Sequence, residues 1–99
     1  MTEHHRTQRW LIVGRVQGVG YRDWMCRAAG ALGVAGWVRN LGTGEVEALV
    51  RAPGDVLDRL REACRSGPSA AIVAEIRERD VAEGTDSVGF ERRPDATGR

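Results

Sequence analysis

The stretch Gly14-Arg15-Val16-Gln17-Gly18-Val19-Gly20-Tyr21-Arg22 connects an apolar run, residues 10–13, to a segment of helical periodicity that begins near Arg22. Three glycines fall within seven residues of this stretch. Because glycine has no Cβ, it adopts positive φ and lets several backbone N–H groups turn into one concavity. The N-terminal end of the following helix adds partial positive charge at the same place. The stretch therefore predicts a strand-to-helix loop that can receive an anion.

Arg22 strengthens this prediction. A cation in the first turn of a helix opposes the helix dipole, a placement that is unfavourable by roughly 0.3–1 kcal/mol. Two explanations fit this placement: Asp23 neutralises the charge locally, or an anionic ligand does. We favour the ligand, although the residues alone leave both explanations open.

The composition excludes several classes of function. The 99 residues carry a net charge of +1, which gives no broad basic field for nucleic acid. No lysine is present, so a Schiff-base lysine is excluded. No apolar run reaches membrane-spanning length, and residues 1–9 are too polar for a signal peptide. We therefore expect one cytoplasmic domain over residues 1–99, with a core at about 6–93 and tails at 1–5 and 94–99, that is monomeric and has no nucleic-acid or membrane partner.

The cysteines and histidines do not indicate a metal site. Cys26 and Cys64 both fall in predicted helices and fit neither a zinc-ligand spacing nor a disulfide framework. We expect them to be small buried thiols, and the sequence leaves open whether they can pair. His4-His5 precedes any element that could hold it, so we expect a solvated pair and no bound metal.

Hydrophobic periodicity predicts seven elements in an α+β order. They are a strand at residues 6–16, a helix at 22–32, strands at 34–41 and 45–51, a helix from 53 to 66, a strand at 71–81 and a short strand at 87–93. The order β-α-β-β-α-β plus a short terminal strand predicts a ferredoxin-like sandwich, an antiparallel sheet with two helices on one face. RNA binding on the open sheet face would need stacking aromatics and a basic groove. The exposed-face candidates are mainly Trp10 and Trp37, and no basic groove accompanies them.

A second motif, Gly36-Trp37-Val38-Arg39-Asn40, ends the second predicted strand just before a glycine-containing turn. Together with the glycine loop, in this order and at this separation, it resembles the acylphosphatase family. The resemblance extends over residues 6–93 and includes Gly67-Pro68 and Gly89-Phe90-Glu91. Neither motif is decisive by itself, whereas the ordered pair is very specific.

The resemblance implies a function and a role for particular residues. It implies that carboxyl phosphates are hydrolysed to carboxylate and inorganic phosphate, without metal or cofactor. Arg22 and the main-chain N–H groups of the loop would hold the phosphoryl group, and Asn40 would position the attacking water. The implied phosphate-binding residues are Arg15, Val16, Gln17, Gly18, Val19, Gly20, Tyr21 and Arg22.

Phosphoryl transfer requires mainly that the reacting groups are positioned and that the negative charge of the transition state is stabilised. A guanidinium and backbone N–H donors supply this stabilisation. The implied roles nevertheless have alternatives. Asn40 could be a turn former ahead of Gly42, and Trp37 is more often a packing residue than a substrate contact. Glu45 stands where some relatives carry a hydroxyl residue that helps to order water, so we do not expect that contact here. The alternative function is a non-catalytic module that binds phosphate or carbamoyl phosphate, as in acylphosphatase-like domains of larger proteins that transfer carbamoyl groups. The natural substrate, and a contribution of Arg15 to the field at the loop, stay open.

Overall fold

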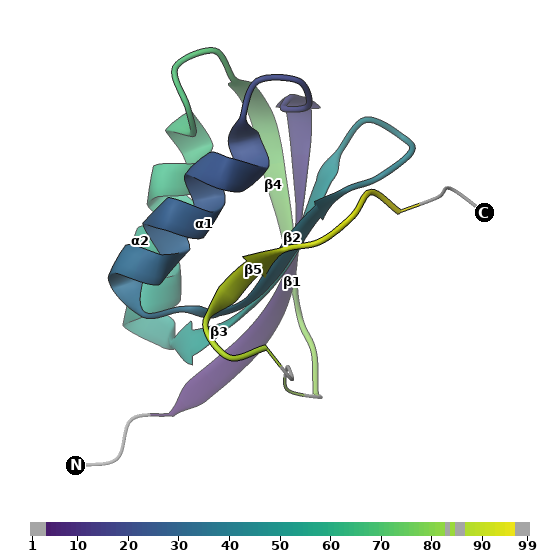
Figure 1. Ribbon diagram of the computed structural model, residues 1–99. Helices are drawn as coiled ribbons and strands as arrows, with labels where there is room; N and C mark the ends of the chain where they lie inside the picture. The colour runs from purple at the N-terminus through teal and green to yellow at the C-terminus, as the bar shows by residue number, and fades with distance from the viewer. Residues whose placement is uncertain (1–3, 83, 85–86, 97–99) are drawn as a thin grey trace.

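Two helices cover one face of a five-stranded sheet in the computed structural model, which describes residues 4–82, 84 and 87–96 (Figure 1). In chain order the elements are β1 His5–Arg15, α1 Tyr21–Leu32, β2 Ala35–Asn40, β3 Val46–Pro53, α2 Gly54–Ser66, β4 Ile72–Asp80 and β5 Phe90–Arg92. The strands lie in the order β4-β1-β3-β2-β5. The predicted ferredoxin-like arrangement is confirmed. The predicted turn at 84–86 and both predicted tails lie partly outside the described residues.

The sheet is mixed, which corrects the expectation of an antiparallel sheet. β5 pairs in parallel with β2, through Trp37 opposite Glu91 and Val38 opposite Arg92, while the other strand pairs are antiparallel. β4 occupies one edge of the sheet and β5 the other, so the chain crosses between two edges before it pairs again. β5 is also shorter than predicted, because regular pairing begins only at Phe90.

The core lies between the helices and the facing side of the sheet. Its buried residues include Trp10, Ile12, Val38, Val46, Ala48 and Val50 from the sheet and Met25, Ala29, Leu57, Leu60 and Cys64 from the helices. The inward positions predicted for the helices are confirmed except for Ala63, which is exposed; Ala28 and Leu32 are only partly buried.

The two tryptophans that were candidates for an exposed aromatic surface are covered. Trp10 is fully buried in the core, and its indole Nε1 donates to Gln8 Oε1 at 2.9 Å, so its assignment to an exposed face was wrong. Trp37 lies on the face away from the helices but is only 7% exposed. The guanidinium carbons of Arg39 and Arg93 lie 4.9 and 5.0 Å from the centre of its ring. Trp37 therefore packs beneath two cations and offers no free stacking surface.

Candidate active site

The glycine loop of residues 16–20 is held at both ends by buried side chains. Val16 and Tyr21 are 1% and 2% exposed, and the Tyr21 hydroxyl donates to the main-chain oxygen of Cys64 on α2 at 2.6 Å. Burial raises the pKa of the Tyr21 hydroxyl far above its usual value, so the group stays neutral and serves as an anchor. Between these anchors Gly18 and Gly20 have φ values of 74° and 79°, a region that other residues rarely adopt.

The first turn of α1 is open to a ligand. Its N-cap residue is Gly20, and no side chain of the described residues caps the helix start by a hydrogen bond. The first backbone N–H groups of a helix have no partners within the helix, and here no capping side chain takes their place. Together with the dipole of α1 they form a site with affinity for a negatively charged group.

Gln17 ties the loop to the β2–β3 hairpin. Its side-chain Nε2 donates to the main-chain oxygens of Leu41 and Glu45, at 2.8 and 2.9 Å. Leu41 directly follows β2 and Glu45 directly precedes β3, so the two bonds connect the loop to the backbone next to Asn40. The Glu45 carboxylate accepts from the Thr43 hydroxyl at 2.5 Å within the same hairpin.

A pocket of about 100 Å³ joins these elements. Its lining residues are Val16, Gly18, Gly20, Tyr21, Arg22, Asp23, Asn40 and Arg92. Six of these residues were predicted from the sequence as site residues. Arg15, Gln17 and Val19 were also predicted, but they do not line the pocket. Asn40 is 8% exposed and ends β2 on the side of the sheet that faces the helices. The pocket thus brings the guanidinium of Arg22 together with an amide from a separate element.

Each arginine at the pocket contacts a carboxylate from a distant part of the chain. Arg22 Nη1 lies 2.7 Å from Asp95 Oδ1, so its ion-pair partner is not the neighbouring Asp23. Asp23 instead accepts from Arg92 Nη1 at 2.7 Å, and this hydrogen bond holds the pKa of the Asp23 carboxyl below its usual value. Arg92 and Asp95 had no local signal in the sequence, because they lie 69 and 73 residues from their partners.

The segment that follows β5 reaches the pocket along β2. The Arg93 amide donates to Val38 O and the Ala96 amide donates to Asn40 O, both at 2.8 Å. Figure 1 shows this yellow segment running alongside β2 toward the hairpin. The backbone that positions Asn40 therefore also positions Asp95.

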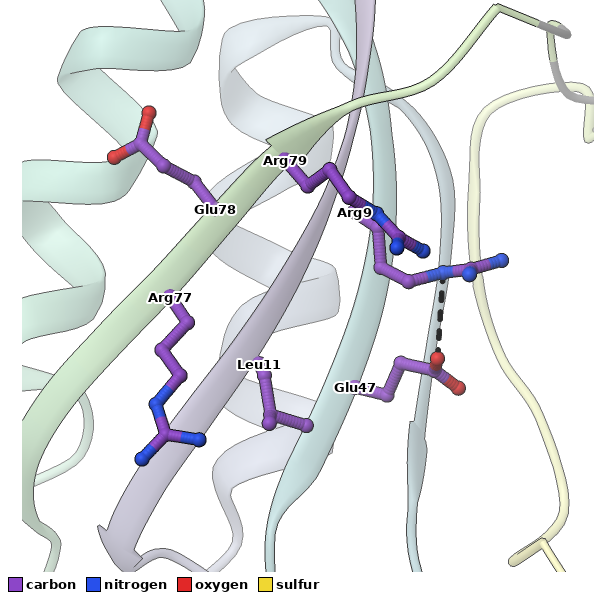
Figure 2. Close-up of a pocket in the computed structure, with 6 residues that line it drawn as sticks. All are labelled: Arg9, Leu11, Glu47, Arg77, Glu78 and Arg79. Carbon is purple, nitrogen blue, oxygen red and sulfur yellow. Dashed lines mark ion pairs between the residues drawn. The ribbon is translucent and has the colours of Figure 1, made fainter.

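A larger depression, of about 390 Å³, lies over β4, β1 and β3, and Figure 2 shows the six residues that line it. Arg9 pairs there with Glu47 at 3.3 Å, whereas Glu78 turns away and pairs with Arg61 of α2 at 3.1 Å. No helix N-terminus and no amide side chain lines this depression. We place the candidate site at the smaller pocket, because among the described residues that line the two pockets only its lining combines a helix start, a guanidinium and a side-chain amide.

Other sites have little support within the described part of the chain. No group of three or more His, Cys, Asp and Glu residues there could hold a metal ion. Cys26 and Cys64 are free thiols; Cys64 is fully buried, as expected, whereas Cys26 is only partly buried, which corrects the expectation for it. None of the described helices has the length and apolar character needed to cross a membrane.

The family model for acylphosphatase matches residues 8–92, which include the loop, both sequence motifs and β5. This chain belongs to the acylphosphatase family. An acylphosphatase of Acidiphilium cryptum is 48% identical over 88 residues, which cover 89% of this chain and 93% of that protein. The crystal structure of an acylphosphatase from Bacillus subtilis superposes with a TM-score of 0.84 at 30% identity, covering 91% of this chain and 99% of the other.

The same fold occurs within a longer protein. Full-length HypF, crystallised in a phosphate- and nucleotide-bound form, matches 99% of this chain with a TM-score of 0.86 at 23% identity. The match covers only 13% of the HypF chain. This likeness concerns the fold alone, whereas the A. cryptum and B. subtilis proteins match over nearly their whole length.

Proposed function

We propose that this member of the acylphosphatase family hydrolyses acyl phosphates at the pocket between α1 and the end of β2. Acyl phosphates are mixed anhydrides of a carboxylic and a phosphoric acid, and the products are a carboxylate and inorganic phosphate. The observation that carries the proposal is the convergence of Arg22 and Asn40, from separate elements, on a helix start that no side chain caps. The family membership of the chain supports the same reaction.

The phosphoryl group binds to the main-chain N–H groups of residues 15–22 and to the Arg22 guanidinium. Gly18 and Gly20 provide the positive φ values that turn these amides inward. The transition state of phosphoryl transfer spreads negative charge over the equatorial oxygens, and donors already in place stabilise that charge. A guanidinium matches the oxygens with several N–H groups in one plane. Arg22 and the loop therefore supply the charge stabilisation.

Asn40 holds the attacking water. A side-chain amide both donates and accepts hydrogen bonds, so it can orient a water without removing its proton. The water oxygen forms a bond to phosphorus while the bond from phosphorus to the acyl oxygen breaks, and the electron pair leaves with the carboxylate. The proton of the water passes to a phosphate oxygen. Because a carboxylate is a weak base, it leaves without a general acid, and no side chain has to titrate near neutral pH.

The decisive experiment measures phosphate release from benzoyl phosphate in the presence of a chelator. Wild type should exceed the spontaneous rate, and Arg22→Gln should lower kcat by about 10²–10³-fold, the loss typical of a single transition-state donor. Equal rates for Arg22→Gln and wild type, or no turnover by wild type, would contradict the proposal. Wild type that binds phosphate without turnover would instead indicate a non-catalytic binding module.

A second variant separates the two roles. Asn40→Ala removes the water contact and leaves the phosphate-binding loop intact, so kcat should fall while the inhibition constant for inorganic phosphate stays near that of wild type. If phosphate binding falls as much as kcat does, Asn40 contacts the phosphoryl group and the assignment of the water to it is wrong.

We further propose that residues 1–99 form one domain and that the enzyme works as a cytoplasmic monomer without nucleic acid. The near-balanced charge supports the absence of a nucleic-acid partner. Two free thiols are in keeping with a reducing compartment. Sedimentation of the purified protein tests whether it is a monomer, and fractionation of its host cell tests whether it is cytoplasmic.

A further inference from the structure

Arg92 is a second guanidinium at the pocket, and the reaction described above gives it no role. It extends from β5, whereas Arg22 extends from α1, and both line the same pocket. Arg92 Nη1 donates to Asp23, the only hydrogen-bond partner of its side chain among the described residues. A guanidinium has five N–H donors, so most of the Arg92 donors have no partner among the described residues. Its side chain is 49% exposed, which leaves it accessible to a ligand.

A purely structural role for Arg92 explains little. The Asp23–Arg92 pair is about half exposed on both sides, and exposed pairs of this kind contribute about 0–1 kcal/mol. The ionised carboxylate of Asp23 is stabilised without a cation, because a carboxylate in the first turn of a helix already interacts favourably with the helix dipole. The pair therefore adds little to the stability of the contact between α1 and β5. Its main effect is to hold the Arg92 guanidinium at the pocket.

On this basis, which rests on the proposed function, we infer that Arg92 is a specificity-determining residue that favours acyl phosphates whose acyl group carries a second anionic group. The phosphoryl group occupies the loop and Arg22, and the acyl group extends along the pocket to Arg92. A carboxylate at the far end of a short acyl chain then accepts a charge-assisted hydrogen bond from the free N–H groups of Arg92. An uncharged acyl chain gains nothing from that contact.

The test compares two substrates with four-carbon acyl groups, succinyl phosphate and butanoyl phosphate, which differ in the terminal carboxylate. Arg92→Gln should lower the ratio of their kcat/KM values, succinyl over butanoyl, by about tenfold, the worth of one hydrogen bond to a charged group. The wild-type ratio should also fall as salt is added, because the contact is partly exposed.

Arg93→Gln is the matched control. It removes the same charge one residue along the chain, but Arg93 lies over Trp37 on the other face of the sheet and pairs with Glu91 at 3.0 Å. The substrate ratio should not change in this variant. Asp23→Asn provides an independent test if Arg92→Gln does not fold, because it removes the negative charge that faces Arg92 and should raise the ratio.

The outcomes separate this inference from the proposed function. If wild type hydrolyses neither substrate above the spontaneous rate, the proposed function fails. If it hydrolyses both and Arg92→Gln lowers both kcat/KM values equally, Arg92 contacts the phosphoryl group or supports the fold, and the inference on specificity is overturned. A ratio that is the same in wild type, Arg92→Gln and Arg93→Gln overturns it as well, and so does an unchanged ratio in Asp23→Asn.

Discussion

Asp95 should compete with phosphate for Arg22, and Asp95→Asn should therefore tighten phosphate binding. The Asp95 carboxylate lies 2.7 Å from Arg22 Nη1, and a phosphoryl group that binds this guanidinium has to displace or repel it. The Arg22 side chain is 20% exposed and that of Asp95 is 62% exposed, so the pair is partly screened by water. A pair of this kind is worth roughly 0.2–1 kcal/mol. Removing its charge should lower the inhibition constant for inorganic phosphate by up to about fivefold.

The assay is competitive inhibition of benzoyl phosphate hydrolysis by inorganic phosphate, at low and at high salt. The difference between Asp95→Asn and wild type should shrink as salt rises. Asp58→Asn is the control, because Asp58 also pairs with an arginine and is 68% exposed, but it lies on α2 and does not line the pocket. A weaker affinity for phosphate in Asp95→Asn, or a loss of kcat as deep as that of Arg22→Gln, would refute competition and show instead that Asp95 orients Arg22.

Three further predictions follow from contacts around the pocket. Gln17→Ala removes two bonds to main-chain oxygens of the hairpin, so the free energy of unfolding in urea should fall by about 1–3 kcal/mol and kcat should fall with it; an unchanged kcat would show that this tie does not position Asn40. Gly36→Ala should lose at least about 3 kcal/mol of stability, because a Cβ there would come within 1.8 Å of Leu49 O, and a wild-type urea midpoint would contradict this. Burial raises the pKa of the Cys64 thiol to about 12, so it should resist a disulfide reagent at pH 8 until urea unfolds the chain; rapid reaction of the native protein at this position would contradict it.

Most of the fold could be predicted from the sequence, because hydrophobic periodicity and the positions of glycines depend on local backbone geometry. The spacing of Met25 and Ala29 predicts the buried stripe of α1, and Gly33 adopts the left-handed conformation expected at a helix end. The parallel pairing of β5 was missed. A strand of three residues carries too little pattern to show its direction, and β5 reaches β2 only by crossing from the opposite edge of the sheet.

The sequence indicated the loop, Arg22 and Asn40 of the candidate site, but not the ion pairs around them. Gly18, Gly20 and Arg22 are neighbours in sequence, so a loop that receives an anion could be inferred from the local pattern. The sequence could not show which carboxylate faces which cation, since Arg22 and Asp23 find partners about seventy residues away in the segment that begins with β5. Adjacent charges in a helix point in different directions, about 100° apart, so they do not contact each other across one residue.

Because Arg22 and Arg92 pair with two different carboxylates, we expect a substrate to affect the two ion pairs differently. Arg22 and Arg92 each pair with a different carboxylate, Arg22 with Asp95 after β5 and Arg92 with Asp23 on α1. Asp95 follows β5 on a segment that two main-chain hydrogen bonds hold to β2, from the Arg93 amide to Val38 O and from the Ala96 amide to Asn40 O, whereas Asp23 belongs to α1. A phosphoryl group that displaces the Asp95 carboxylate from Arg22 does not have to break the separate hydrogen bond between Arg92 and Asp23. We expect Asp95→Asn to change phosphate affinity without changing the ratio of succinyl to butanoyl phosphate, and Asp23→Asn to change that ratio. Measuring both quantities in both variants checks this independence, and a double variant whose effects on either quantity are not additive would show that the two carboxylates act as one unit.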